Sequence, residues 1–423
     1  MDTRAIVESM SLERIIQKNS PKQSPEKEES GKEDVIRTPF HTATLQAFAK
    51  ELPEKATELE AVLTEIDRQA VENFSVYESE AIPGVSFSYS KLAITPEIVQ
   101  RFATTFKNTS ASSETVEEQL PEDTDKQSDA KQQDYFLFTG FNPPPGGNAF
   151  TVQDVAIDRF IRLLPQVANS MRTGVTPPNI TIYMLGGPTG LGGTVTTGWL
   201  NAARKDSIDA DATLYAEFIE RHAHGGDNAS ILLQGVSRGA LVAQKTSSKL
   251  PNELQKISQR LLDNPAGEHE RGSVFSKKGR QVAAGFLEEL QYQGQGDIMK
   301  TLSKEDAKFR EALVRRKGLK PEGAVQKVLK LGTVAAEAFE LIRGTSLDTE
   351  KNRSYIRRGL YDPTTFSKER LEEVNGKEFD AINAHIFKRG AAVEAPFKGR
   401  HFFMYDRYKH WEKVLDFVKK TNA

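Results

Sequence analysis

A serine flanked by two glycines, in the run Gly235-Val236-Ser237-Arg238-Gly239, constrains the fold more than any other feature of this 423-residue chain. The apolar stretch 229–233 precedes the run, and the helix-forming residues 240–244 follow it. A strand that turns at once into a helix leaves no room for side chains beside the turn, so glycine is needed on both flanks. Ser237 at the tip must adopt a strained backbone that holds its hydroxyl clear of the sheet. The run predicts a strand, a sharp turn and a helix.

Segments with strand and helix patterns alternate ahead of this turn. Apolar stretches at 135–138 and 180–185 predict buried strands, and residues with helical periodicity cover 152–171 and 210–222. Strands that alternate with long helices predict an α/β fold, with a mostly parallel sheet and helices on both faces. Ligands bind such sheets at the carboxyl ends of the strands, where three glycine-rich loops would meet.

Composition and periodicity divide the chain into six segments. We expect a mostly disordered N-terminal tail over 1–38, a helix and a hairpin over 39–107, a disordered acidic linker over 108–133, the first part of the core over 134–267, an inserted helical cap over 268–349 and the second part of the core over 350–423. A further strand is predicted at 257–262. Alternating patterns return near 381–387 and 391–393, and an amphipathic helix covers 411–419.

Composition also limits the classes of function. The net charge of −2 and the 38% apolar residues are those of an ordinary soluble protein and favour neither nucleic acid nor a membrane surface as a partner. The absence of cysteine excludes disulfides, zinc–thiolate sites and a cysteine nucleophile. Charges near the N-terminus argue against a signal peptide, and no apolar run reaches the roughly 18 residues of a membrane span. We therefore expect a cytoplasmic protein, whose oligomeric state the sequence leaves open.

No cofactor or metal is expected. The glycine-rich loop 186–193 lacks both the Gly-Lys-Ser/Thr ending and the G-x-G-x-x-G pattern of phosphate-binding loops. No two histidines have the i, i+4 spacing of metal ligands on a helix. We expect instead a mobile loop that lines a pocket, with Gly186 and Gly187 as substrate-binding residues.

From about residue 134 to the C-terminus the chain resembles the α/β-hydrolases, in its strand order, its turn at Ser237, its inserted cap and its last helix. Capped members of that superfamily commonly end in a glycine, a histidine, a phenylalanine, a few residues, an acid and then a helix. The run Gly399-Arg400-His401-Phe402-Phe403-Met404-Tyr405-Asp406 is similar, with one extra residue before the histidine. The resemblance implies Ser237 as the nucleophile and His401 as the catalytic histidine.

The resemblance also implies an oxyanion hole in the loop after the first core strand. Gly140-Phe141 is similar to the histidine–glycine–X element of the family, with Thr139 in place of the histidine. The backbone N–H groups of Phe141 and Arg238 would stabilise the oxyanion, each by about 3 kcal/mol. Because these donors are backbone groups, the change at Thr139 does not remove them. Gly140 and Asn142 would line the substrate site.

Seven histidines compete for the catalytic role, and only their positions distinguish them. His410, just before the last helix, is the main alternative to His401. The others are expected to be structural or to lie outside the core: His41 in the N-terminal part, His222 and His224 at a helix end, His269 in the cap and His385 within a strand.

The acid of the triad is the part that the sequence determines least. In the usual arrangement of the family it follows the penultimate strand, and between residues 382 and 401 only Glu394 is available there. Asp263 ends the predicted strand after the turn, a position that some members use, although an aspartate there also suits a turn. Asp263 is favoured, and Glu394, Asp362 and Asp380 are the alternatives.

These residues predict a serine hydrolase that cleaves the carboxylic ester of a small or acyl-chain substrate through an acyl-enzyme on Ser237. A helical cap implies that an apolar part of the substrate is enclosed. Two alternatives remain open. One is an acyltransferase with the same triad, and the other is a non-catalytic binding or scaffold protein on a hydrolase fold.

Overall fold

The computed structural model describes residues 56–108, 131–140, 153–263 and 308–345, the backbone of 354–359 and 392–397, and scattered residues between 36 and 53 and between 265 and 287. All of them belong to one unit of the chain, residues 36–423. The predicted tail and acidic linker lie almost entirely outside the described residues, as does the pattern at 381–387.

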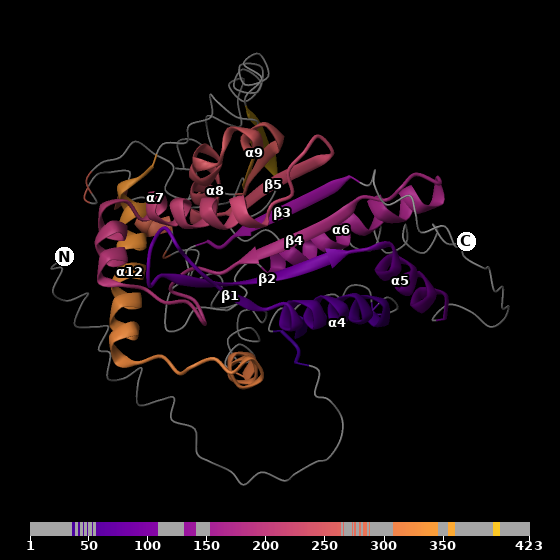
Figure 1. The fold of residues 1–423 in the computed structure, drawn as a ribbon, viewed down its shortest axis with the longest axis horizontal. Coiled ribbons are helices and arrows are strands. Elements are labelled where there is room, and N and C mark those ends of the chain that lie inside the picture. The colour runs from indigo at the N-terminus through magenta and orange to yellow at the C-terminus, as the bar shows by residue number, and fades with distance from the viewer. Residues whose placement is uncertain are drawn as a thin grey trace, which may run out of the picture. The chain divides into compact units, whose positions relative to one another are not determined.

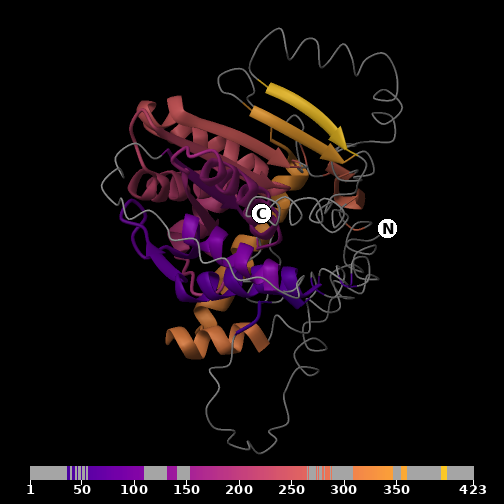
Figure 2. The ribbon, with the colours of Figure 1, turned by 90° about the vertical axis from the view of Figure 1, so that its right-hand side faces the viewer.

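One eight-stranded sheet runs through the described part of the chain, in the order β1-β2-β4-β3-β5-β6-β7-β8. Its strands are β1 (Ser75–Glu78), β2 (Ser86–Ile94), β3 (Gln132–Phe138), β4 (Asn179–Leu185), β5 (Ala229–Val236), β6 (Ser258–Asp263), β7 (Ser354–Gly359) and β8 (Ala392–Phe397). β2 is antiparallel to both of its neighbours, and every other pair is parallel. Figure 2 shows β7 and β8 side by side, in orange and yellow. The predicted α/β class with a mostly parallel sheet is confirmed.

Helices cover both faces of this sheet (Figure 1). One face carries α4 (Ala56–Glu72), α5 (Pro96–Asn108) and α6 (Gln153–Arg172); the other carries α7 (Thr197–His222), α8 (Arg238–Lys249), α9 (Asn252–Ile257) and α12 (Ala324–Arg343). Residues 308–317 are also helical. Among the helices described, none combines the length and the apolar character that crossing a bilayer requires.

Alternate side chains of the strands supply the two hydrophobic cores, because successive residues of a strand point to opposite faces. In β3, Leu137 packs in the core with α4, α5 and α6, whereas Phe136 and Phe138 pack with α7 and α8. Burial on both faces explains why the central strands are continuous apolar stretches in the sequence.

Three elements differ from the sequence-based expectation. The hairpin formed by β1 and β2, expected ahead of the core, joins the same sheet beside β4, so the sheet begins well before residue 134. The sequence does not predict β7, because Arg357 and Arg358 interrupt its apolar pattern. α7 begins at Thr197 rather than near residue 210, because the polar run 204–207 hides the helical periodicity of its first half.

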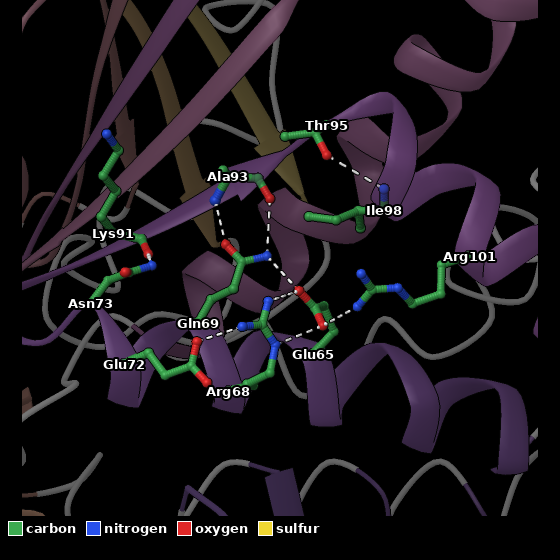
Figure 3. A network of polar contacts seen from close by, with 10 residues as sticks. All are labelled: Glu65, Arg68, Gln69, Glu72, Asn73, Lys91, Ala93, Thr95, Ile98 and Arg101. Carbon is green, nitrogen blue, oxygen red and sulfur yellow. Dashed lines mark hydrogen bonds and ion pairs between the residues drawn. The ribbon is translucent and has the colours of Figure 1, made fainter.

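Side chains of α4 close a free edge of β2 (Figure 3). β1 pairs only with residues 86–89 of β2, so within the described residues no strand lies beside the rest of this edge. The Ala93 N–H donates to Gln69 Oε1 at 2.6 Å, and Gln69 Nε2 donates to the Ala93 carbonyl at 3.1 Å. Asn73 Nδ2 donates to the Lys91 carbonyl at 2.9 Å. The two amides therefore substitute for a neighbouring strand.

Glu65 holds Gln69 in this position and connects α4 to α5. Its Oε1 accepts from Gln69 Nε2 at 3.0 Å, and its carboxylate pairs with Arg68 at 2.6 Å and with Arg101 of α5 at 3.1 Å. Burial alone would raise the pKa of Glu65, but the hydrogen bonds and positive charges outweigh it and lower that pKa. Glu65 is therefore held as an anion at neutral pH.

Replacing Gln69 with leucine should lower the free energy of unfolding by about 1–3 kcal/mol, because both peptide groups of Ala93 lose their partner. Urea denaturation measures this loss. Asn73→Leu is the matched control: it removes one exposed hydrogen bond, so a loss of about 0.5 kcal/mol is expected. If the two variants lose equal stability, the edge-closing role of Gln69 is wrong.

Candidate active site

Ser237 occupies a strained turn between β5 and α8. Its backbone angles are φ 57° and ψ −127°, and it is the one non-glycine residue with positive φ in the described part of the chain. β5 ends at Val236 and α8 begins at Arg238, so the predicted strand, turn and helix are confirmed. A non-glycine residue persists in such a conformation only where its surroundings enforce it, and such strain clusters at functional sites.

The two glycines make this turn possible because the backbone segments approach too closely for a side chain. A Cβ atom at Gly235 would lie 2.1 Å from the Gly239 carbonyl oxygen. A Cβ at Gly239 would lie 2.5 Å from the Thr139 carbonyl oxygen, in the loop after β3. Gly140 lies against the same turn, since its Cβ would stand 3.5 Å from Ser237 Cβ. The loop predicted to form the oxyanion hole therefore begins beside the serine.

The Ser237 side chain is buried, and its hydroxyl has no hydrogen-bond partner among the described residues. The sequence predicts a hydroxyl that is clear of the sheet, but only 3% of the residue is exposed. Its backbone N–H donates to the Asp263 carbonyl at 2.8 Å, which fixes the turn to β6. A buried hydroxyl without a partner costs stability.

Arg238, directly after the serine, anchors the turn through a buried ion pair. Its Nη1 lies 2.6 Å from Asp211 Oδ2, and its Nη2 donates to the Ser207 carbonyl at 3.1 Å. α7 breaks at Asp206 (φ −159°, ψ 95°), whose Oδ1 accepts from the Asp209 N–H at 2.8 Å. The second half of α7 therefore starts next to Arg238.

Glu337 of α12 adds a second carboxyl group beside this arginine. Burial raises the pKa of Glu337 to about 7, although the charge of Arg238 opposes the shift. Burial likewise raises the pKa of Asp211, against the same arginine. Burial would lower the pKa of Arg238, but the charges of Glu337 and Asp211 outweigh it and raise that pKa. One permanent cation thus faces two carboxyl groups whose pKa values are raised by burial.

The glycine-rich loop after β4, which the sequence predicts to be mobile and to line a pocket, is held by hydrogen bonds to its neighbours. The Gly186 N–H donates to the Ser88 carbonyl at 2.8 Å, and the Tyr215 hydroxyl donates to the Gly186 carbonyl at 2.9 Å. Farther along the loop, Lys330 of α12 donates to the Gly190 carbonyl at 2.8 Å. A Cβ at Gly187 would lie 3.9 Å from Thr139 Cγ2, so this loop adjoins the loop after β3.

Asp263 ends β6 directly beside the turn. It is fully buried, and its Oδ2 accepts from Gln234 Nε2 at 2.8 Å. Gln234 Oε1 accepts in turn from Arg159 of α6 at 2.8 Å and 3.1 Å. In the register of the sheet Asp263 pairs with Val236, the residue before the serine.

Glu394, an alternative acid, lies within β8 rather than after it. β8 is three strands from β5, which corresponds to about 14 Å at the usual strand spacing. Asp362 follows the end of β7 by three residues in the sequence. Because β7 is the penultimate strand of the described sheet, the strand order keeps Asp362 as an alternative acid.

Three of the seven histidines are described, and each has a structural contact. Buried His41 Nδ1 lies 2.6 Å from Asp67, His222 stacks on Phe218 with ring centroids 4.0 Å apart, and His224 Nδ1 lies 2.9 Å from Asp134. The remaining predicted residues lie outside the described residues: Phe141, Asn142, His269, Asp362, Asp380, His385, His401 and His410. No group of three or more metal-ligating side chains is present among the residues described.

Sequence reasoning missed Asp211, Glu337 and Gln234. Asp211 stands between two alanines of α7, and Glu337 stands in the run Ala335-Ala336-Glu337-Ala338. A lone acid among small apolar residues is the one sequence signal that could have suggested a buried carboxyl group.

A sheet in this order, reversed only at β2, with a serine at a strained turn after β5, is the arrangement of the α/β-hydrolases. The chain has the α/β-hydrolase fold. The resemblance noted from residue 134 onward thus extends to the N-terminal hairpin, which supplies β1 and β2.

Comparison with known proteins gives structural likenesses alone. No protein-family model and no curated protein matches the chain. Similar solved structures include a thioesterase domain from the curacin biosynthetic pathway (TM-score 0.38, 11% identity, covering 81% of this chain and 98% of that chain). YbtT, a type II thioesterase from the yersiniabactin NRPS/PKS pathway, has a TM-score of 0.33 at 13% identity over 70% of this chain and 96% of its own. A marine microorganism esterase has a TM-score of 0.32 at 14% identity over 68% and 95%. Likenesses this weak transfer neither substrate nor mechanism.

Glu337→Gln should flatten the pH dependence of stability. Burial raises the folded-state pKa of Glu337 from the ordinary 4.5 to about 7, so the folded protein keeps a proton that the unfolded chain releases. The stabilisation is complete below the lower value and is lost as the pH rises through the upper one. Glutamine does not titrate, so the variant should lose less stability than the native chain across this window.

Urea denaturation at both ends of the window measures the effect. Glu311→Gln, at an exposed position of the helix 308–317, is the control and should show the same dependence of unfolding free energy on pH as the native chain. If the unfolding free energy of Glu337→Gln changes with pH as much as that of the native chain, the Glu337 carboxyl does not hold a proton in the folded state as proposed.

Proposed function

We propose that this protein is a serine hydrolase that cleaves a carboxylic ester through an acyl-enzyme on Ser237. The observation that carries the proposal is the strained turn at Ser237, with φ 57° and a buried hydroxyl that has no partner among the described residues. Strain and an unsatisfied hydroxyl each cost stability, and Ser237 follows the carboxyl end of β5, at the edge of the sheet where ligands bind in such folds.

In the proposed mechanism His401 takes the proton of the Ser237 hydroxyl as the oxygen attacks the ester carbonyl. The backbone N–H groups of Arg238 and Phe141 stabilise the oxyanion. Support for this role comes from the buried pair of Arg238 with Asp211, which fixes the residue whose N–H would donate. Gly140 lies against Ser237, so the loop that holds Phe141 begins in the right place. His401 then protonates the leaving alcohol, and water releases the acid.

Asp263 is the proposed acid behind His401. Its strand neighbours β5, and its carboxylate is fixed by Gln234 at 2.8 Å. An acid in this role must hold one tautomer of the imidazole and stabilise its charged form. Asp362 is the alternative that the strand order favours, since it follows the penultimate strand.

A fluorophosphonate probe should label the native chain and fail to label Ser237→Ala, because the probe reacts only with an activated serine. Ser230→Ala, which removes an exposed serine from the same strand, is the matched control and should label normally. Absence of labelling in the native chain would favour a non-catalytic protein on this fold. Equal labelling of Ser237→Ala would place the nucleophile elsewhere.

Replacing Asp263 with asparagine should lower kcat for an ester substrate by up to about 10⁴-fold with little change in KM, because the imidazole would adopt the wrong tautomer. Glu394→Gln should leave kcat near the native value, since β8 lies three strands from Ser237. Steady-state kinetics on both variants and on Asp362→Asn identifies the acid. Near-native turnover in Asp263→Asn with a large loss in Asp362→Asn would assign the role to Asp362.

A further inference from the structure

Helix α12 buries polar residues and exposes apolar ones. Its buried positions are the polar Lys330, Thr333, Glu337 and Glu340 together with the apolar Val334, Ala336 and Leu341. The exposed fractions of its large apolar residues are 72% for Val325, 69% for Val328, 48% for Leu331 and 53% for Phe339, and Ala335 is exposed as well. These five residues, spaced three or four apart, form one continuous row that we call the α12 stripe. It is about 21 Å long at the usual helical rise.

Specific polar contacts hold the helix in this orientation. The Gln326 amide bonds both peptide groups of Val195, accepting from its N–H at 3.1 Å and donating to its carbonyl at 2.9 Å. Lys330 donates to the Gly190 carbonyl at 2.8 Å. Rotating the helix to bury the stripe would break these bonds and move Glu337 away from Arg238. The exposure of the stripe is therefore built into the fold.

Exposed apolar side chains concentrate in this part of the chain. Of the eight large apolar residues that are exposed in the described residues, six lie between β6 and β7: Phe275, Leu287 and the four large members of the stripe. Single exposed apolar residues are common, but a continuous row of them marks a surface that contacts something else.

The charges of the segment that carries the stripe indicate what that partner is. Residues 308–343 contain nine Lys and Arg against four Glu, a local charge of +5 in a chain whose net charge is −2. Two of those glutamates, Glu337 and Glu340, are buried. The basic residues Arg315, Arg316, Lys320 and Lys327 are exposed. A second copy of the chain would bring the same positive charges to the contact, whereas an anionic lipid surface attracts them.

We propose that the α12 stripe docks on the surface of an anionic lipid bilayer, with its apolar side chains in the headgroup boundary and the exposed cations of the same segment on the lipid phosphates. The whole-chain composition conceals this surface, because the acidic residues elsewhere cancel its charge. Gln326 and Lys330 connect the docking helix to the loop after β4, at the same edge of the sheet as Ser237. Docking rests on α12 and on the exposed cations at positions 315, 316, 320 and 327, and it does not require the proposed catalysis.

The test is flotation of the full-length Ser237→Ala protein with phosphatidylcholine vesicles, with and without phosphatidylglycerol. We expect binding to the phosphatidylglycerol vesicles that weakens as salt is added. Val328→Asp should weaken it by about tenfold or more, because it places a charge in the headgroup boundary. Val175→Asp is the matched control, since Val175 is 60% exposed in the connection between α6 and β4 and lies off the stripe.

Replacing exposed cations with neutral residues tests the electrostatic contribution to vesicle binding. The pair Lys320→Gln and Lys327→Gln should weaken binding, whereas the pair Arg172→Gln and Lys256→Gln, exposed elsewhere, should not.

The proposal is overturned if no vesicle binds, or if Val328→Asp binds as well as Val175→Asp. It is also overturned if sedimentation shows a dimer that Val328→Asp dissociates, since a second copy would then cover the stripe. Fluorophosphonate labelling of Val328→Asp with an intact Ser237, without lipid, should stay at the native level, so a failure of docking is distinct from a failure of catalysis.

Discussion

The buried pair of Arg238 and Asp211 is the interaction on which the rest of this site depends. A buried guanidinium is tolerable only with an anion at hydrogen-bond distance, and Asp211 supplies one at 2.6 Å. The pair joins the first residue of α8 to the second half of α7, and Glu337 brings α12 to the same point. Three helices on one face of the sheet therefore meet at one charge, and that charge belongs to the residue after Ser237.

The strain at Ser237 persists because several neighbours enforce it together. The Gly235–Gly239 contact sets the sharpness of the turn, the loop after β3 closes it from one side, and the Ser237 N–H is bonded to β6 at 2.8 Å. Relaxing φ toward negative values would break that bond. Strain of about 1–3 kcal/mol is maintained by contacts whose combined loss would cost more.

The sequence predicts the parts of this structure that are local. The turn can be predicted because its glycines and serine are close together in the sequence. β3, β4 and β5 can be predicted because burial on both faces leaves continuous apolar runs. β7 cannot be predicted in this way, because Arg357 and Arg358 interrupt its apolar pattern and the strand is defined by its pairing with β6 and β8. The acids around Arg238 come from positions 211 and 337, so no local sequence pattern predicts that they meet. An acid on a helix also usually faces solvent.

The two faces of α12 connect the buried charge to the exposed stripe. Glu337 faces Arg238 on the inside, and Val328 and Phe339 are exposed on the outside of the same rigid element. The inner face buries Val334, Ala336 and Leu341 beside its polar residues, so the position of α12 depends on this packing together with the bonds made by Gln326 and Lys330. Those bonds end on the loop after β4, whereas Glu337 lies beside Arg238, the residue after Ser237. One helix therefore carries the proposed docking surface on its outer face and, on its inner face, the carboxyl group beside the residue that follows the proposed catalytic serine.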